Sequence, residues 1–160
     1  VTTERVETFD LRLEQGWNLL SLPVQPVDSS VDVVLQNHHT GPVWSWTGEQ
    51  YTIAAELDPK KAYWVYRAGP SVSVFITGRR VEDPVRRDVG EGWQAVGPVA
   101  PPPFDEAVVP GWLENVDDDR VLKPVYGFGN DAYQEVDELL PGGGYWMYVN
   151  RPGDLSMGAE

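Results

Sequence analysis

The chain lacks cysteine and has only three lysines and two histidines among its 160 residues. Without cysteine there is no disulfide framework, no thiolate metal site and no cysteine nucleophile. No stretch approaches the roughly 18 consecutive apolar residues that a membrane-spanning helix requires. The shortage of basic residues leaves a formal net charge of −13, which would repel a nucleic-acid backbone or an anionic membrane. We therefore expect neither nucleic acid nor a membrane as a partner.

Glycine and proline, in contrast, are abundant, and they separate many short apolar runs. The chain has 16 glycines and 14 prolines, dispersed rather than clustered. The most regular of the runs are AYWVY at 62–66 and GYWMY at 144–148, in which bulky side chains alternate. Alternation of aromatic and β-branched residues over five positions predicts a strand. We expect an all-β fold, mainly β with short helical turns.

The aromatic motif is one part of an internal duplication. GWNLLS at 16–21 aligns with GWQAVG at 92–97, and VWSW at 43–46 aligns with VYGF at 125–128. The two offsets, 76 and 82, place six extra residues of the second copy between Trp93 and Tyr126. Ordered matches of rare residues over a period the size of a small domain indicate two homologous units. We predict β repeat units at 1–78 and 79–160, packed as a pseudo-symmetric tandem of β-sandwich type.

Each unit has a readable strand pattern. Residues 8–13 predict a half-buried strand with Phe9, Leu11 and Leu13 inward, and 17–22 predicts a central strand because it is apolar on both faces. Hairpins are expected at 43–53 and 126–136 around glycine turns. Between the strand at 17–22 and the first hairpin, a short helix capped by Ser29 or Ser30 is expected, with Val31, Val34 and Leu35 at helical spacing. The equivalent 104–108 should be a helical turn at most. Asn18 and its counterpart Gln94, if buried, should bond nearby backbone.

The run GWNLLSLP at 16–23, followed by an aromatic pair before a glycine turn and by Tyr63–Tyr66, resembles the GWNLISLP repeats of large secreted and cell-surface bacterial or archaeal proteins. The resemblance covers nearly all of the first unit. The second unit departs from it, with QAVGP at 94–98. The resemblance implies a non-catalytic, β-rich extracellular module of a longer chain. It implies no defined ligand, no cofactor and no active-site residues.

The aromatic residues can be interpreted in two ways. Trp17, Trp64, Trp93 and Trp146 recur at equivalent places, and we expect them to be core anchors, since each indole can bury about 150–250 Å². Alternation puts Tyr63 on the face opposite Trp64 and Tyr66, so part of each motif should face solvent or the other unit. Trp112 has no counterpart in the first unit. A carbohydrate-binding alternative would use exposed aromatic rings, here Trp112, Tyr63, Tyr66, Tyr145 and Tyr148, as a coplanar row.

Other candidate sites are weaker. Asp117, Asp118 and Asp119 could contribute to a calcium site, but the spacing fits no EF-hand, and a solvated acidic loop is the simpler interpretation. His38 and His39 are expected to lie in a polar connection exposed to water. The glycines at 142–144 are followed by a strand rather than by the helix that a phosphate loop needs. No spacing nominates a hydrolase triad or a glycosidase carboxylate pair.

The expected function is a non-catalytic, extracellular or cell-surface structural or protein-interaction module without cofactors. Its partners would be other protein modules or further copies of itself, with the strand at 1–13 paired in the same chain or donated to another as an assembly unit. The alternative is a carbohydrate-binding module with a polysaccharide partner.

Overall fold

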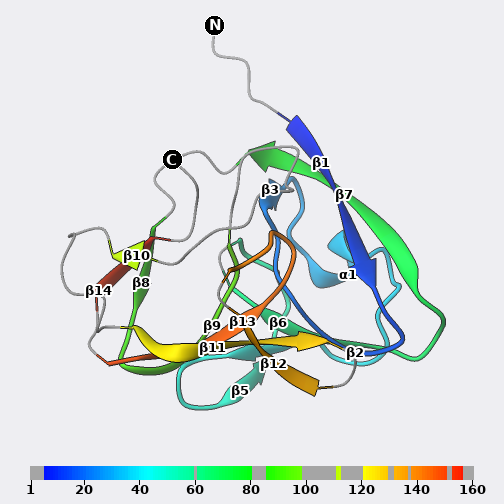
Figure 1. Cartoon of the computed structure of the whole chain (residues 1–160). Helices are drawn as coiled ribbons and strands as arrows, with labels where there is room; N and C mark the ends of the chain where they lie inside the picture. The colour runs from blue at the N-terminus through cyan, green and yellow to red at the C-terminus, as the bar shows by residue number, and fades with distance from the viewer. Residues whose placement is uncertain are drawn as a thin grey trace, which may run out of the picture.

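A computed structural model describes residues 6–59, 61–80, 86–98, 111–112, 121–129, 132–136, 138–150 and 153–156 (Figure 1). In the first half, the elements are β1 (Val6–Leu13), β2 (Gly16–Leu20), β3 (Val24–Pro26), α1 (Val31–Val34), β4 (Trp44–Trp46), β5 (Tyr51–Ile53), β6 (Tyr63–Arg67) and β7 (Val72–Arg80). In the second half, they are β8 (Arg86–Val89), β9 (Gly92–Val96), β10 (Gly111–Trp112), β11 (Val121–Gly129), β12 (Ala132–Val136), β13 (Tyr145–Val149) and β14 (Gly153–Ser156). The all-β prediction is confirmed.

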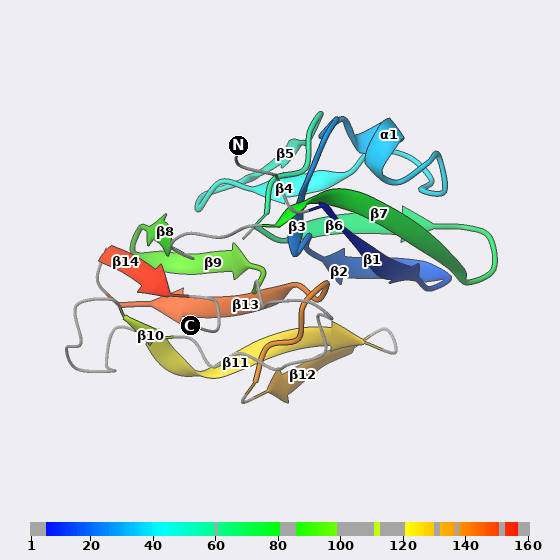
Figure 2. The same ribbon diagram turned by 90° about the horizontal axis from the view of Figure 1, so that it is seen from above.

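The described strands form four antiparallel sheets, two in each half. The first half has the orders β1-β7-β3 and β2-β6-β4-β5, and the second half has β8-β14-β10 and β9-β13-β11-β12. The strands of the second half therefore follow the same order in their sheets as the corresponding strands of the first half. Figure 2 shows β9, β13, β11 and β12 side by side, next to the strands of the first half. The expected boundary after residue 78 falls inside a strand, because β7 continues to Arg80.

The core of the first half lies between its two sheets and α1. β1 alternates as predicted, with Leu11 and Leu13 buried and Phe9 packed against the same cluster. From the opposite sheet, Tyr63 and Val65 of β6 reach this cluster. Full burial of a side chain of this size stabilises a fold by roughly 1.5–3 kcal/mol. Seen from above, β1 and β7 overlie β2 and β6 (Figure 2), which is the layering of a sandwich.

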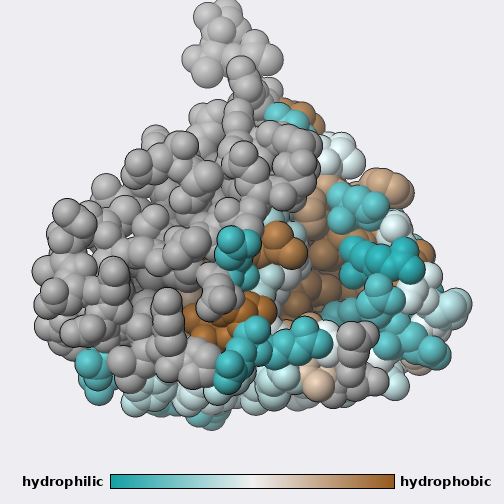
Figure 3. All heavy atoms as spheres, viewed as in Figure 1, coloured by the Kyte–Doolittle hydropathy of each residue, from teal (hydrophilic) through white to brown (hydrophobic). Residues whose placement is uncertain are grey.

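On the outward face of the sheet β1-β7-β3, most of the exposed side chains of β1 are polar. Hydrophilic residues gather on the right-hand side of Figure 3, with hydrophobic residues visible in the recesses between them. Along β1, Asp10 and Arg12, which alternate with the buried Leu11 and Leu13, are exposed. The pattern is that of a sheet with one face on a core and one face in water.

The predicted hairpins are confirmed by the β4–β5 pair and the β11–β12 pair. α1 begins after Ser30, although the serine side chain makes no capping hydrogen bond. The helix is a single turn that buries Val31 and Val34. The helical turn expected at 104–108 lies outside the described residues.

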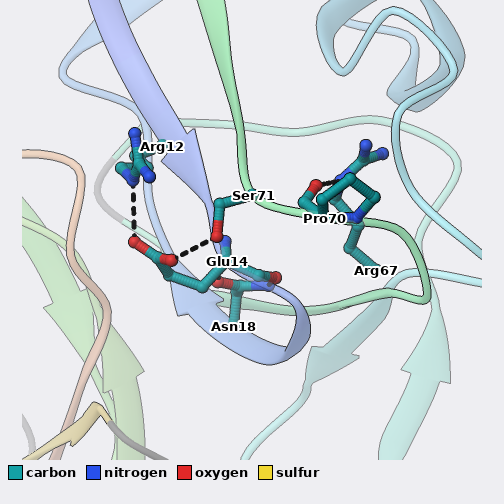
Figure 4. A network of polar contacts seen from close by, with 6 residues as sticks. All are labelled: Arg12, Glu14, Asn18, Arg67, Pro70 and Ser71. Carbon is teal, nitrogen blue, oxygen red and sulfur yellow. Dashed lines mark hydrogen bonds and ion pairs between the residues drawn. The ribbon is translucent and has the colours of Figure 1, made fainter.

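The turn between β1 and β2 shows which groups the half-buried amide of Asn18 bonds. Its Nδ2 donates to the Glu14 carbonyl at 2.9 Å, and its Oδ1 accepts from the Glu14 N–H at 3.0 Å (Figure 4). In the second half, Gln94 Nε2 donates to the Gly90 carbonyl at 3.0 Å, which is the same position of the turn. The expectation that both amides bond nearby backbone is confirmed.

The prediction of a central strand at 17–22 is wrong. β2 lies at the end of its sheet and pairs along its length with β6 alone. It is apolar on both faces for another reason. Leu20 contributes to the core of the first half, whereas Leu19 is buried in a second cluster together with Ala95 and Trp146 of the second half.

Candidate functional site

The sheet β2-β6-β4-β5 carries aromatic side chains on the face turned away from its own core. Because side chains alternate along a strand, the burial of Tyr63 and Val65 places Trp64 and Tyr66 on the opposite face. Strand register sets Tyr66 opposite Trp17, and Trp64 opposite both Leu19 and Trp44. The hairpin then extends this face, with Trp44 opposite Ile53 and Trp46 opposite Tyr51.

The sheet β9-β13-β11-β12 repeats this arrangement. Here Tyr148 lies opposite Trp93, and Trp146 lies opposite both Ala95 and Tyr126. On the hairpin, Tyr126 lies opposite Glu135 and Phe128 lies opposite Tyr133. Each sheet thus has an aromatic face. Its aromatic members are Trp17, Trp44, Trp46, Tyr51, Trp64 and Tyr66 in the first half, and Trp93, Tyr126, Phe128, Tyr133, Trp146 and Tyr148 in the second.

The two aromatic faces pack against each other. The Trp46 ring of the first half lies 5.5 Å from the Trp146 ring of the second, and Phe128 lies 4.9 Å from Trp64. These two contacts are reciprocal, because Trp46 aligns with Phe128 and Trp64 aligns with Trp146 at the offset of 82. The buried residues of this seam are Leu19, Ala62, Ala95 and Trp146.

Backbone contacts across the seam are reciprocal as well. Leu20 forms a β-bridge with Gly143, and Val96 forms one with Lys61. Around the first bridge, the Ser21 N–H donates to the Gly142 carbonyl at 2.9 Å and the Gly144 N–H donates to the Leu19 carbonyl at 3.0 Å. The turns before the two aromatic strands therefore hold the halves together.

Two pockets open where the aromatic faces meet. The first has a volume of about 460 Å³, and its lining residues are Trp17, Trp44, Tyr51, Trp64 and Phe128. The second has a volume of about 420 Å³, and its lining residues are Trp46, Tyr51, Trp93, Tyr126, Tyr133 and Trp146. Exchanging each residue of the first set for its aligned counterpart gives the second set, apart from Tyr51, which lines both. Below, these are the first and second pockets.

The rings in these pockets are inclined to one another. Trp17 meets Tyr66 at 63°, Trp93 meets Tyr148 at 82°, and Trp93 meets Tyr126 at 45°. Among the described rings that line the two pockets, the contacts run from 45° to 90°, so none is coplanar. The arrangement encloses a compact group from several sides and does not present a flat platform.

The four tryptophans predicted as core anchors differ from one another in burial. Trp17 is 43% exposed and Trp93 is 42% exposed, so their prediction as core residues is wrong. They lie on the aromatic faces at the pocket walls, because alternation directs their neighbours Asn18 and Gln94 to the other side. Trp64 is half-buried, and Trp146 is buried in the seam rather than between the sheets of its own half.

Of the expected ligand-contact residues, two are buried and two lie on the aromatic faces. Tyr63 is 3% exposed and Tyr145 is 7% exposed, and each hydroxyl accepts a backbone N–H, from Asp58 at 3.0 Å and from Leu140 at 2.9 Å. Burial raises the pKa of Tyr145, although the Leu140 N–H opposes the rise. Both tyrosines are structural, so their place in an exposed row is wrong. Tyr66 and Tyr148 lie on the aromatic faces, whereas the side chain of Trp112 lies outside the described residues.

The second pocket contains a tyrosine hydroxyl and a buried indole N–H that lie close together. Burial raises the pKa of the Tyr133 hydroxyl, the nearby Tyr51 raises it further, and the Trp146 indole N–H opposes the rise. This indole Nε1 is buried, and no hydrogen bond of acceptable geometry reaches it. Buried donors usually have a partner. The Tyr133 hydroxyl is the neighbouring acceptor for this indole N–H.

The described residues contain no group of three or more His, Asp or Glu side chains arranged to hold a metal ion. The weak calcium candidates Asp117, Asp118 and Asp119 lie outside those residues. His39 is not left in water as expected: its side chain is largely covered, and its Nε2 lies 3.1 Å from Asp32 Oδ1. The described part of the chain also has no helix long and apolar enough to cross a membrane.

Sequence reasoning missed several pocket residues, namely Trp44, Trp46, Tyr51, Tyr126, Phe128 and Tyr133. The available signal was the alternation in the two hairpins: each has two alternating aromatic residues on its first strand and one tyrosine on its second. Whether that face met solvent or the other half required the arrangement of the sheets. In comparisons with known proteins, no family model, no curated protein and no solved structure matched this chain.

Proposed function

We propose that this chain is a non-catalytic structural and protein-interaction module of a cell-surface protein, built as a tandem of two homologous units. The observation that carries the proposal is the reciprocal packing of the two aromatic faces, which joins the halves and leaves two related pockets. The resemblance to GWNLISLP repeats and the matching strand orders support the tandem.

The aromatic faces have two roles in this proposal. Their centre, around Leu19, Ala95 and Trp146, fixes one half against the other. Their margin leaves Trp17 and Trp93 partly exposed beside the pockets. Exposed tryptophans beside pockets are the residues that most often dominate binding energy at protein interfaces. Recognition is therefore assigned to the margin.

The pocket chemistry favours binding over catalysis. A glycoside hydrolase needs two carboxyl groups facing each other about 5–10 Å apart. The described residues that line the two pockets are all aromatic. Such walls bind apolar or cationic groups, and the described lining residues include no pair of carboxyl groups.

Donation of the strand at 1–13 is not part of the proposal. Residues Val6–Leu13 pair with β7 of the same half over their whole length. A strand already paired in its own sheet has to be released before another chain can take it. Assembly is therefore proposed through the aromatic margin and not through strand exchange.

Carbohydrate binding is the second candidate, and the exposure of Trp17 and Trp93 at equivalent places favours it. Sugar rings stack on exposed indoles, and two such sites could hold one polysaccharide. The inclined rings count against it, because this alternative predicts a coplanar row.

A binding assay on cell envelopes of the producing organism separates the two candidates. The labelled chain is compared with a Trp17→Ala/Trp93→Ala variant, on envelopes treated with protease or with glycosidases. The interaction module predicts saturable binding that protease treatment abolishes and that the variant lacks. Binding that survives protease but is lost after glycosidases would favour the carbohydrate alternative. Equal binding by the variant would exclude the aromatic margin. Circular dichroism of the variant controls for folding.

A further inference from the structure

The two pockets differ in charge at one aligned position. On β12, Glu135 lies opposite Tyr126, which lines the second pocket. The aligned position on β5 is Ile53, opposite Trp44 of the first pocket. Side chains directly opposite on neighbouring strands have their Cβ atoms about 4.5–5.5 Å apart. Glu135 is exposed, so its carboxylate is accessible beside the Tyr126 wall of the second pocket, whereas the aligned position at the first pocket carries the apolar Ile53.

The surroundings of the second pocket favour a cation. The chain has a net charge of −13, and no lysine or arginine is among the described residues that line either pocket. The faces of tryptophan and tyrosine rings attract cations within about 6 Å of the ring centre. Six aromatic side chains line this pocket, and inclined rings expose several faces and edges to one enclosed group.

We propose that the second pocket receives an arginine side chain of a protein partner, with its guanidinium against the aromatic walls and paired with Glu135. This names the partner chemistry of the proposed interaction module and so rests on that proposed function. The first pocket, with Ile53 in place of the carboxylate, has no such preference for a cation.

Arginine fits better than lysine for two reasons. A planar guanidinium stacks on aromatic rings and is more weakly hydrated than an ammonium group. Its fork of N–H donors can also pair with both oxygens of one carboxylate while it remains against a ring. The lysine ammonium is a compact, strongly hydrated charge and gains less from the aromatic walls.

The test uses the capped peptide Gly-Gly-Arg-Gly-Gly and a second peptide with citrulline, the neutral isostere, in place of arginine. Binding to the whole chain is followed by NMR at the indole N–H signals. The arginine peptide should bind at least about threefold more tightly than the citrulline peptide. Glu135→Gln should weaken arginine binding roughly two- to fivefold and leave citrulline binding unchanged. Trp93→Ala should weaken arginine binding roughly tenfold.

The aligned position supplies the matched controls. Trp17→Ala should not change arginine binding, whereas Ile53→Glu should create a second, weaker arginine site at the first pocket. Equal binding of both peptides, or no effect of Glu135→Gln, would overturn the arginine proposal. Because envelope binding that depends on Trp17 and Trp93 is measured separately, the proposed function can survive that result. If envelope binding does not depend on Trp17 and Trp93, both the proposed function and the arginine proposal are wrong.

Discussion

The first and second halves of this chain place their strands and rings alike, yet they differ where the rings meet. Trp46 donates its indole N–H to the Trp93 carbonyl at 2.9 Å, whereas the aligned Phe128 has no donor to offer Trp17. Ile53 stands where the second half has Glu135. Residues that set the packing are thus closely matched, and residues beside the pockets have diverged. The difference indicates that the seam is a shared structural element, while the pockets are free to specialise.

The largest effect on stability should come from removing the buried ring of the seam, Trp146. Trp146→Ala should lower the free energy of unfolding by about 3–5 kcal/mol, because it leaves a cavity in the seam against Trp46. Trp93→Ala, at an exposed position of the same half, should lower it by only about 1 kcal/mol. Urea unfolding followed by circular dichroism measures both. Equal losses would mean that the seam contributes little to stability.

A smaller effect is expected at the pair formed by Gly97 and Ser21, which align at the offset of 76. A Cβ at Gly97 would clash with the Ser21 side chain. Gly97→Ala should therefore destabilise the fold by about 1–3 kcal/mol through overpacking. Gly129→Ala is the control, since its Cβ would meet nothing closer than Gln134 Nε2 at 3.8 Å.

Exchanging that pair tests whether the seam is reciprocal. Ser21 Oγ donates to the Gly143 carbonyl at 2.6 Å. Gly143 aligns with Lys61, and the Lys61 carbonyl lies 3.3 Å from a Cβ placed at Gly97. A serine at position 97 would therefore have the equivalent carbonyl nearby. A Ser21→Gly/Gly97→Ser variant should thus recover most of the stability lost in Gly97→Ala. Thermal unfolding of the variants makes the comparison, and no recovery would argue against equivalent surroundings.

The indole donor of Trp46 should have a moderate effect. Trp46→Phe makes this position resemble Phe128 and removes the hydrogen bond to the Trp93 carbonyl, which should cost about 1 kcal/mol of unfolding free energy. In the double variant with Phe128→Trp, a donor returns at the aligned place and should reach the Trp17 carbonyl. Chemical unfolding would show partial compensation. A loss in the double variant that equals or exceeds that of Trp46→Phe would show that the two positions are not interchangeable.

The smallest effect should come from the β1–β2 turn, where Glu14 aligns with Gly90. The hydrogen bond from Ser71 Oγ, followed by that from Arg12, lowers the pKa of the Glu14 carboxyl below its ordinary 4.5 (Figure 4). A depressed pKa stabilises the fold above the unfolded pKa, and this contribution is lost as pH falls through the folded pKa.

Glu14→Gln should therefore be less stable than the natural chain at pH 7, with a difference that shrinks as the pH falls below about 4.5. Carbon-13 NMR of the Glu14 carboxyl measures its pKa directly, and Ser71→Ala should raise it. A stability difference independent of pH would assign the effect to packing rather than to charge.

The sequence by itself determined the strands, the hairpins and the backbone bonding of Asn18 and Gln94, because each depends on local patterns of alternation, turn residues and buried amides. The order of strands in a sheet and the partner of each face involve residues far apart in the chain. Alternation shows that Trp64 and Tyr66 share a face, but it cannot show which of the two faces meets a core. Only the tertiary structure decided that Tyr63 and Tyr145 belong to the cores, and that the tryptophans instead face the other half across the two pockets.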